Sequence, residues 1–284
     1  MPNLRDLRKR IRAIENIKRI TSAMEKIAAA RLFRTRGLLM DARPYAKALE
    51  EVARDLLNSQ PEAAHPLLAR NETGDPLIVL VTSDRGFGGA YNSRIIQATS
   101  EFAAKLGAAG TKYMVFGRKG IQYLERNGIP ALASYTRLPV WVGHDMASEV
   151  AEKIIGLYLS GEISEAFLAS TEFTSIGRHD ARVARLLPVE RKPEPEKNYM
   201  NYSYEPEPAE TIAAILPHLV KTRIWIGLLE SVVSEYAERM LMMERATKNT
   251  DDLMAALTLA MNKARQMMIT RELTDIVGAA ETIA

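Results

Sequence analysis

A seven-residue apolar repeat runs without interruption through roughly the last seventy residues of the chain. It steps by three and four residues, and its only polar members are threonines. A 3.5-residue period sustained this far requires a long helix wound left-handedly on a partner helix. From Glu210 to Val277 the rod would be roughly 100 Å long at the helical rise per residue. The repeat consists of Ile212, Ile215, Leu219, Thr222, Ile226, Leu229, Val233, Tyr236, Met240, Met243, Thr247, Thr250, Met254, Leu257, Met261, Ala264 and Met268.

The opposite end of the chain carries the stripe expected to pack on this rod. Its members are Leu4, Leu7, Ile11 and Ile14, followed by Ile17, Ile20, Met24 and Ile27. The three steps of three from Ile11 to Ile20 predict a stammer, which locally overwinds a coiled coil. We expect this helix to continue past Gly37, with Pro44 as a kink or an end. Two ordinary amphipathic helices on a globular domain are the alternative, but eight heptads exceed what a domain surface usually covers.

The middle of the chain has the pattern of a separate α/β body. Short apolar runs at 77–82, 112–116 and 166–174 read as strands, and segments 90–106, 119–126 and 146–159 read as helices. Strands separated by helices predict a small parallel or mixed sheet, Rossmann-like in its order. A Pro- and Glu-rich loop follows, with an edge strand expected around Tyr199 to Tyr204. The expected fold class is therefore α/β: an antiparallel coiled coil of residues 1–57 and 209–284 with an inserted domain of residues 75–208.

A glycine loop, Ser83 to Ala90, lies between a predicted strand and a predicted helix, where phosphates often bind. Its glycines follow G-x-G-G rather than G-x-G-x-x-G, and no G-K-[ST] follows. We therefore expect a tight turn, with Asp84 capping the turn or a helix instead of acting as an acid or base. The four histidines are scattered, and Asp251 and Asp252 are neighbours that point in different directions on a helix. The sequence thus predicts no catalytic residues, no metal and no cofactor.

Composition limits the kinds of bond, partner and cellular location that this protein can have. The absence of cysteine excludes disulfides, thiolate metal sites and thiol redox control. The first forty residues carry eleven basic and three acidic residues, although the whole chain has a net charge of only +3. Such a cationic helix attracts nucleic acid, anionic lipid or an acidic protein surface. No run of eighteen apolar residues and no signal peptide is apparent, so we expect an internal protein that does not span a membrane.

Two other functions are compatible with these features. A nucleotide-using α/β enzyme with coiled-coil arms would need the glycine loop as its phosphate site. A nucleic-acid binder would use the cationic helix and would show strongly salt-dependent binding. Its basic residues surround the helix and no aromatic residue interleaves with them before Phe33, which disfavours this second reading.

Several motifs, in order along the whole chain, resemble the γ-subunit family of F-type ATP synthases. They are the stretch from Leu7 to Met24, Ser83-Asp84-Arg85-Gly86 with Gly88, Gly89 and Asn92, Tyr204-Glu205-Pro206-Glu207, Ser234 to Met240, Asn262 to Gln266, and Ile269 to Val277. The resemblance implies a central-stalk rotor that makes no bond itself. Rotation of the rotor would couple transmembrane proton flow to ATP synthesis or hydrolysis at the catalytic sites of α and β subunits.

The resemblance also implies partners and contact residues. Three α and three β subunits would surround the shaft, and the foot would lie on the ring of c subunits beside ε, so that membrane association comes only through the complex. The location implied is peripheral, on the cytoplasmic face of a bacterial inner membrane. The residues matching positions that meet the α/β hexamer are Met24, Arg239, Arg265, Gln266, Ile269, Thr270 and Ile276, within an apolar tip that also holds Met267, Met268 and Val277. Those matching c-ring or ε contacts are Tyr204, Glu205 and Glu207.

Overall fold

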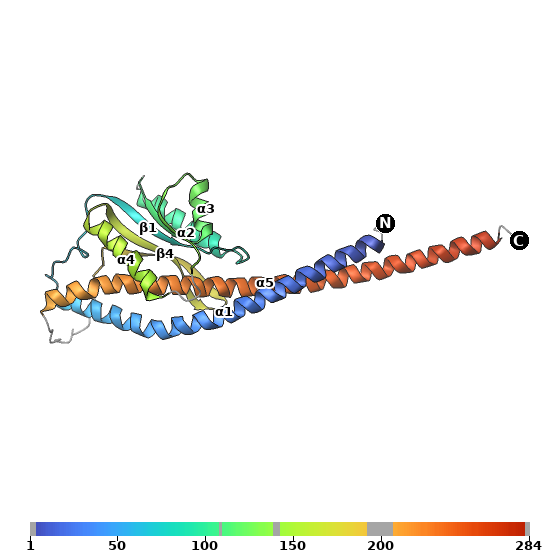
Figure 1. Cartoon of the computed structure of the whole chain (residues 1–284), viewed down its shortest axis with the longest axis horizontal. Coiled ribbons are helices and arrows are strands. Elements are labelled where there is room, and N and C mark those ends of the chain that lie inside the picture. The colour runs from blue at the N-terminus through green and yellow to red at the C-terminus, as the bar shows by residue number, and fades with distance from the viewer. Residues whose placement is uncertain (1–3, 108–109, 139–142, 192–206, 282–284) are drawn as a thin grey trace. The chain divides into compact units, whose positions relative to one another are not determined.

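The computed structural model describes residues 4–107, 110–138, 143–191 and 207–281. It divides into two compact units, which we call the helix pair (residues 1–28 and 239–284) and the body (residues 29–238). Two long helices, α1 (Leu4–Ser59) and α5 (Pro208–Glu281), contribute to both units. Figure 1 draws them in blue and in orange to red.

In the helix pair, the two chain ends run antiparallel. Lys18 Nζ lies 2.5 Å from Asp251 Oδ1, and one turn away the Thr247 and Thr21 hydroxyls are 2.9 Å apart. Residue numbers therefore rise along α5 as they fall along α1, as expected for a pair formed by opposite termini.

The predicted repeat on α5 is confirmed by burial. Between residues 251 and 264 only four side chains are partly shielded from solvent, and all four belong to the repeat. They are Met254, Leu257, Met261 and Ala264. Leu259, which lies off the repeat, is 72% exposed.

The predicted stammer on α1 is wrong. The shielded positions continue in unbroken heptads through Ile14, Lys18, Thr21, Glu25 and Ala28. Polar side chains fit these half-exposed positions because Lys18 and Thr21 have partners on α5. The isoleucines that would have made the stammer lie outside instead, and Ile17, Ile20 and Ile27 are 46, 59 and 55% exposed.

Pro44 neither ends α1 nor prevents its continuation to Ser59. The proline side chain is exposed, so solvent can satisfy the carbonyl that its missing N–H leaves free. Pro217 and Gly227 likewise lie within α5, and the helix is continuous through both.

The body contains a five-stranded mixed sheet with the strand order β3-β2-β1-β4-β5. The strands are β1 (Asp75–Val81), β2 (Lys112–Phe116), β3 (Ala131–Tyr135), β4 (Ile163–Ser175) and β5 (Arg178–Leu187). The first four are parallel to one another, and β5 pairs antiparallel with β4. This is the predicted architecture, enlarged by two strands, β3 and β5, that the sequence pattern did not predict.

Three helices connect the strands: α2 (Tyr91–Leu106), α3 (Arg118–Arg126) and α4 (His144–Leu159). The core beneath α2 and α3 includes Ile95, Leu124 and the sheet residues Leu80 and Phe167. Figure 1 shows α3 above the sheet and α4 below it. Below the sheet, α4 lies beside α5 and contacts it through Glu152 with Lys221. Continuous apolar runs in β1 and β2 follow from this coverage, because both faces of these strands are buried. The predicted edge strand around Tyr199 to Tyr204 lies outside the described residues.

Within the body, α5 packs against both α1 and the sheet. Arg223 of α5 forms a two-pronged ion pair with Glu50 of α1, at 2.6 and 2.8 Å. On the sheet side, a Cβ at Gly227 would meet the Leu168 side chain at 2.4 Å. Glycine thus allows α5 to approach β4 closely, which explains its place inside a helix.

Candidate functional site

The glycine loop is engaged by the chain's own polar groups. The Asp84 carboxylate accepts hydrogen bonds from the backbone N–H groups of Arg118, at 3.1 Å, and Arg137, at 2.7 Å. Thr82 Oγ1 accepts a hydrogen bond from the backbone N–H of Gly120 at 2.8 Å. Gly120, like Arg118, lies in the first turn of α3. At the start of α3, the backbone N–H groups of Arg118 and Gly120 therefore already have acceptors. Asp84 thus has structural hydrogen bonds, but it does not cap α2, the helix that follows its own loop. Its carboxylate instead lies at the start of α3, whose N-cap residue is Gly117.

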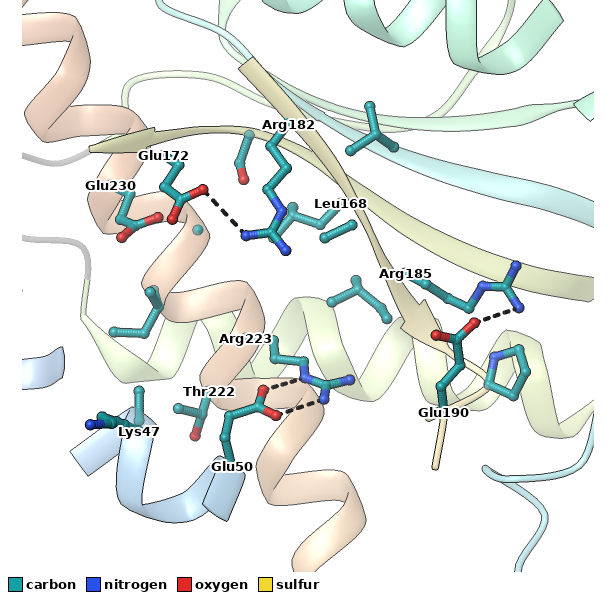
Figure 2. A pocket seen from close by; sticks show the side chains of 18 residues that line it. Lys47, Glu50, Leu168, Glu172, Arg182, Arg185, Glu190, Thr222, Arg223 and Glu230 are labelled. Atoms are coloured by element: carbon teal, nitrogen blue, oxygen red, sulfur yellow. Dashed lines mark hydrogen bonds and ion pairs between the residues drawn. The ribbon is translucent and has the colours of Figure 1, made fainter. Parts of the chain in front are cut away.

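A cavity of about 550 Å³ lies in the body between α1, α5 and the β4–β5 hairpin. Its charged lining residues are Lys47, Arg182, Arg185 and Arg223 together with Glu50, Glu172, Glu190 and Glu230. Figure 2 shows the ion pairs that join them across the cavity wall, such as Arg182 with Glu172 at 3.2 Å and Arg185 with Glu190 at 3.2 Å. The two signs balance, so the cavity offers no net charge to attract an ionic ligand.

One carboxyl group of this cavity is chemically distinct. Burial raises the pKa of Glu230, while the hydrogen bond from Arg43, at 2.6 Å, opposes the rise. Arg43 also donates to the Phe173 carbonyl, so it ties α1 to both the sheet and α5. The Arg43 guanidinium, with Glu230 as one of its partners, therefore links three elements. Among the described residues, no group of three or more His, Asp or Glu side chains is placed to hold a metal ion.

The apolar end of α5 is exposed in a way that a packed helix is not. Met268, Ile269 and Ile276 are 48, 47 and 65% exposed. The contacts at Thr21 and Asp251 place the start of α1, at Leu4, near the level of residue 265. Past that level, the described part of α1 has no residue opposite α5. A single helix with exposed apolar side chains indicates a partner surface.

The remaining predicted contact residues occupy different surroundings. Arg265, Gln266 and Thr270 are exposed on α5, whereas Arg239 is buried, with 7% exposure. Met24 is half-buried on α1. By the register of the pair, Met24 lies level with about residue 244, which is roughly 7 Å along the axis from Arg239 at the helical rise. That Met24 and Arg239 face one another directly stays a prediction.

At the other end of α5, Glu207 is exposed immediately before the helix begins. Tyr204 and Glu205 lie outside the described residues, so their predicted contacts with the c-ring or ε are not addressed by the structure.

The outer stripe of Ile17, Ile20 and Ile27 is a candidate contact surface that sequence reasoning missed. Those residues had been assigned to the inside of the pair. A second heptad register, one residue after Ile17, Ile20 and Met24, would have identified them as outer residues. It passes through Lys18, Thr21 and Glu25 and continues the spacing of Ile11 and Ile14 without a fault.

By length and composition, α5 is apolar enough to cross a membrane over the part from Pro208 to Thr274. Half of its most apolar window is buried inside the structure. The core helix of a water-soluble domain has the same property.

Comparisons with known proteins agree along the full length. A family model described as ATP synthase matches residues 3–283. The ATP synthase gamma chain of Desulfitobacterium hafniense is 37% identical, with all of both chains covered. That of Chlorobaculum tepidum is 35% identical, covering 100% of this chain and 99% of the relative.

Solved structures share the fold. The rotor of Euglena gracilis mitochondrial ATP synthase matches with a TM-score of 0.68 at 14% identity, over 94% of this chain and 98% of that one. A chain from the central stalk and c-ring of Tetrahymena thermophila mitochondrial ATP synthase matches with a TM-score of 0.62 at 22% identity, over 80% and 99%. The long helices, the mixed sheet and the full-length matches lead to one conclusion: the chain belongs to the ATP synthase γ-chain family.

Proposed function

We propose that this chain is the central-stalk rotor of an F-type ATP synthase and carries no catalytic site itself. Its rotation couples transmembrane proton flow to ATP synthesis or hydrolysis at sites on α and β subunits. The observation that carries this proposal is the exposed apolar end of α5, which continues past the level where α1 begins. An isolated helix of this kind is stable only when another surface surrounds it.

The α/β hexamer is the partner proposed for that end. Ile269, Thr270 and Ile276 would lie in its apolar sleeve, with Arg265 and Gln266 meeting polar loops of β. Met24, Arg239 and the outer isoleucine stripe of α1 would face the same subunits. The basic residues that surround this stretch of α1 favour acidic partner segments and would speed their encounter.

The foot of the rotor is proposed to comprise residues 75–208, between coiled-coil segments 1–57 and 209–284. Tyr204, Glu205 and Glu207 would contact the c-ring and ε. The chain would then be peripheral on the cytoplasmic face of a bacterial inner membrane. The burial of α5 against the sheet supports a core helix over a membrane span.

The non-catalytic part of the proposal is supported by Asp84, the acidic residue of the glycine loop, which is held in two structural hydrogen bonds. A phosphate could reach the Arg118 N–H at the start of α3 only by displacing the Asp84 carboxylate. That exchange would bring two anions together, which is unfavourable.

Reconstitution tests the proposal. The full chain is mixed with purified α and β subunits, and the mass of the complex and its ATPase activity are measured. One copy per three α and three β, with activity above that of α and β alone, is expected. No association, together with ATP hydrolysis by this chain alone, would contradict the proposal and favour the nucleotide-using enzyme.

A matched pair of variants locates the contact. Ile276→Asp places a charge on the proposed tip, and Leu159→Asp places one at an exposed site of the body, where Leu159 is 57% exposed. The first should weaken assembly and the second should leave it unchanged. Equal effects would show that the tip is not the contact.

A further inference from the structure

Besides its apolar repeat, α5 carries a second buried stripe, made of small and polar residues. Gly227, Ser231, Ser234 and Glu238 follow one another by four, three and four residues, so they share one face of the helix. Ser231, Ser234 and Glu238 are 1, 0 and 7% exposed. We call these four residues the polar stripe. They face the sheet and α2, whereas Tyr236, a member of the apolar repeat, meets Arg31 of α1.

The polar stripe continues the hydrogen bonding of the sheet. The pairing of β1 with β4 ends at Leu80 and Ala169. Two residues further along β4, Thr171 donates its backbone N–H to Ser231 Oγ at 3.1 Å, and its carbonyl accepts from Ser234 Oγ at 3.4 Å. One helix thus satisfies both the backbone N–H and the backbone carbonyl of Thr171, and both of these bonds are buried.

Two further elements hold the same face. Tyr91 of α2 donates its hydroxyl to the Ser231 carbonyl at 3.0 Å. Glu238 Oε2 accepts from Arg94 of α2 at 2.9 Å and also contacts His179 Nε2 of β5. Three residues over about two turns, Ser231, Ser234 and Glu238, therefore join α5 to β4, β5 and α2 through five contacts.

Hydrogen bonds and apolar contacts resist motion differently. A hydrogen bond weakens steeply when its angle or distance changes, whereas burial of apolar surface has no preferred direction. Turning α5 about its own axis would swing the polar stripe sideways and misalign every one of these bonds together. Apolar side chains on the opposite face would lose far less on a small turn.

We propose that the polar stripe is the torque joint of the rotor, which locks α5 against turning relative to the sheet. Ser231, Ser234 and Glu238 act as positioning residues, and Gly227 brings the helix close enough for the bonds to form. This inference rests on the proposed rotary function and adds to it the residues that carry twist between the helix and the body.

Single-molecule rotation of the complex tests the joint. The chain has no cysteine, so Arg126→Cys, at an exposed position of α3, gives one attachment point for a bead on the body. The angular variance of the bead is measured while the α/β hexamer, fixed to a surface, holds the shaft in a catalytic pause. This variance reports the torsional stiffness of the joint. Loss of directional bonds should lower that stiffness, whereas loss of apolar packing alone should not.

The test variant is Ser231→Ala with Ser234→Ala, and the matched control is Val233→Ala, a fully buried member of the apolar repeat. Removing the directional bonds should increase the angular variance about two-fold. The control should lower the melting temperature of the isolated chain at least as much while leaving the variance unchanged. If the double variant does not assemble, either single substitution is used, with a smaller expected increase.

Glu238 provides a second comparison. Glu238→Gln keeps an acceptor for Arg94 and should retain wild-type variance, whereas Glu238→Ala should increase it. If the angular variance rises in every variant in proportion to the fall in melting temperature, the joint is overturned. The polar stripe would then contribute only packing. A wild-type complex that assembles without rotating would instead contradict the proposed function itself, and the joint with it.

Discussion

Thr21 of α1 and Thr247 of α5 touch across the helix pair with their hydroxyl oxygens 2.9 Å apart, although 226 residues separate them in sequence. Replacing either by valine removes a hydrogen bond while keeping the shape, and should lower the free energy of unfolding by about 1 kcal/mol. Replacing both leaves two apolar groups in contact and should recover most of that loss. Urea unfolding of the full chain, followed by circular dichroism, measures the double-mutant cycle. Strictly additive losses would mean that the contact contributes nothing.

The outer isoleucine stripe should matter for assembly but not for the stability of the chain alone. Ile20→Ser, at 59% exposure, should change the free energy of unfolding by no more than about 0.5 kcal/mol. It should nevertheless weaken binding to α and β subunits. Leu7→Ala, on the inner stripe at 3% exposure, should reverse this order, because it removes buried contacts within the pair. Thermal melts and affinity measurements on both variants make the comparison, and an Ile20→Ser chain that binds normally would remove the stripe from the interface.

Asp84 should prove to be a structural residue. Asp84→Ala leaves the N–H groups of Arg118 and Arg137 without their acceptor and should cost roughly 1–3 kcal/mol of stability. Asp84→Asn keeps one acceptor oxygen and should cost less. In the assembled complex at a temperature where both variants are folded, the ATP hydrolysis rate per complex should equal that of wild type. A loss of hydrolysis by Asp84→Asn with unchanged stability would argue for a chemical role.

Glu230 should give the body a pH-dependent stability. Its pKa is raised above the ordinary value of 4.5 by burial, against the opposing effect of Arg43. The folded state therefore holds the proton more tightly than the unfolded state, and the resulting stability is complete below pH 4.5 and is lost as pH rises through the raised pKa.

Glu230→Gln cannot titrate and isolates this contribution. Urea unfolding of wild type and variant is compared from pH 4 to pH 7. The wild-type chain should lose stability relative to Glu230→Gln as pH rises across that range. A difference that stays constant would show that Arg43 cancels the effect of burial, and one that changes in the opposite direction would show that Arg43 outweighs it.

The sequence pattern predicted α5 well because a long repeat leaves few choices. Each turn must shield the next member, and the members from Met254 to Ala264 are the partly shielded ones there. On α1 the same reasoning was wrong, because it sorted residues by hydrophobicity alone. Lys18 takes a place in the inner heptad because Asp251 lies opposite, and such pairing cannot be seen from the sequence of one helix.

Two strands and the polar stripe were missed for related reasons. β5 alternates arginine with apolar residues, and its charges find partners such as Glu172 and Glu165 only once β4 lies beside it. β3 is short, with alternate residues exposed. Ser231 and Ser234 look like solvent-facing residues until the strand that needs their hydroxyls is known. Contact residues such as Tyr204 came from family resemblance and not from physical pattern.

Folding of the body also provides a route by which the helix pair can form. Arg31 and Tyr236 are in contact inside the body, so a folded body already holds the roots of both helices together. Closing a loop of more than two hundred residues is slow and entropically costly, yet once the body exists no such loop remains to be closed. The helix pair can then zip from its roots toward the chain termini, one heptad at a time. Amide exchange should be slowest near the roots and fastest at the tips, and a chain whose body cannot fold should never acquire the rod.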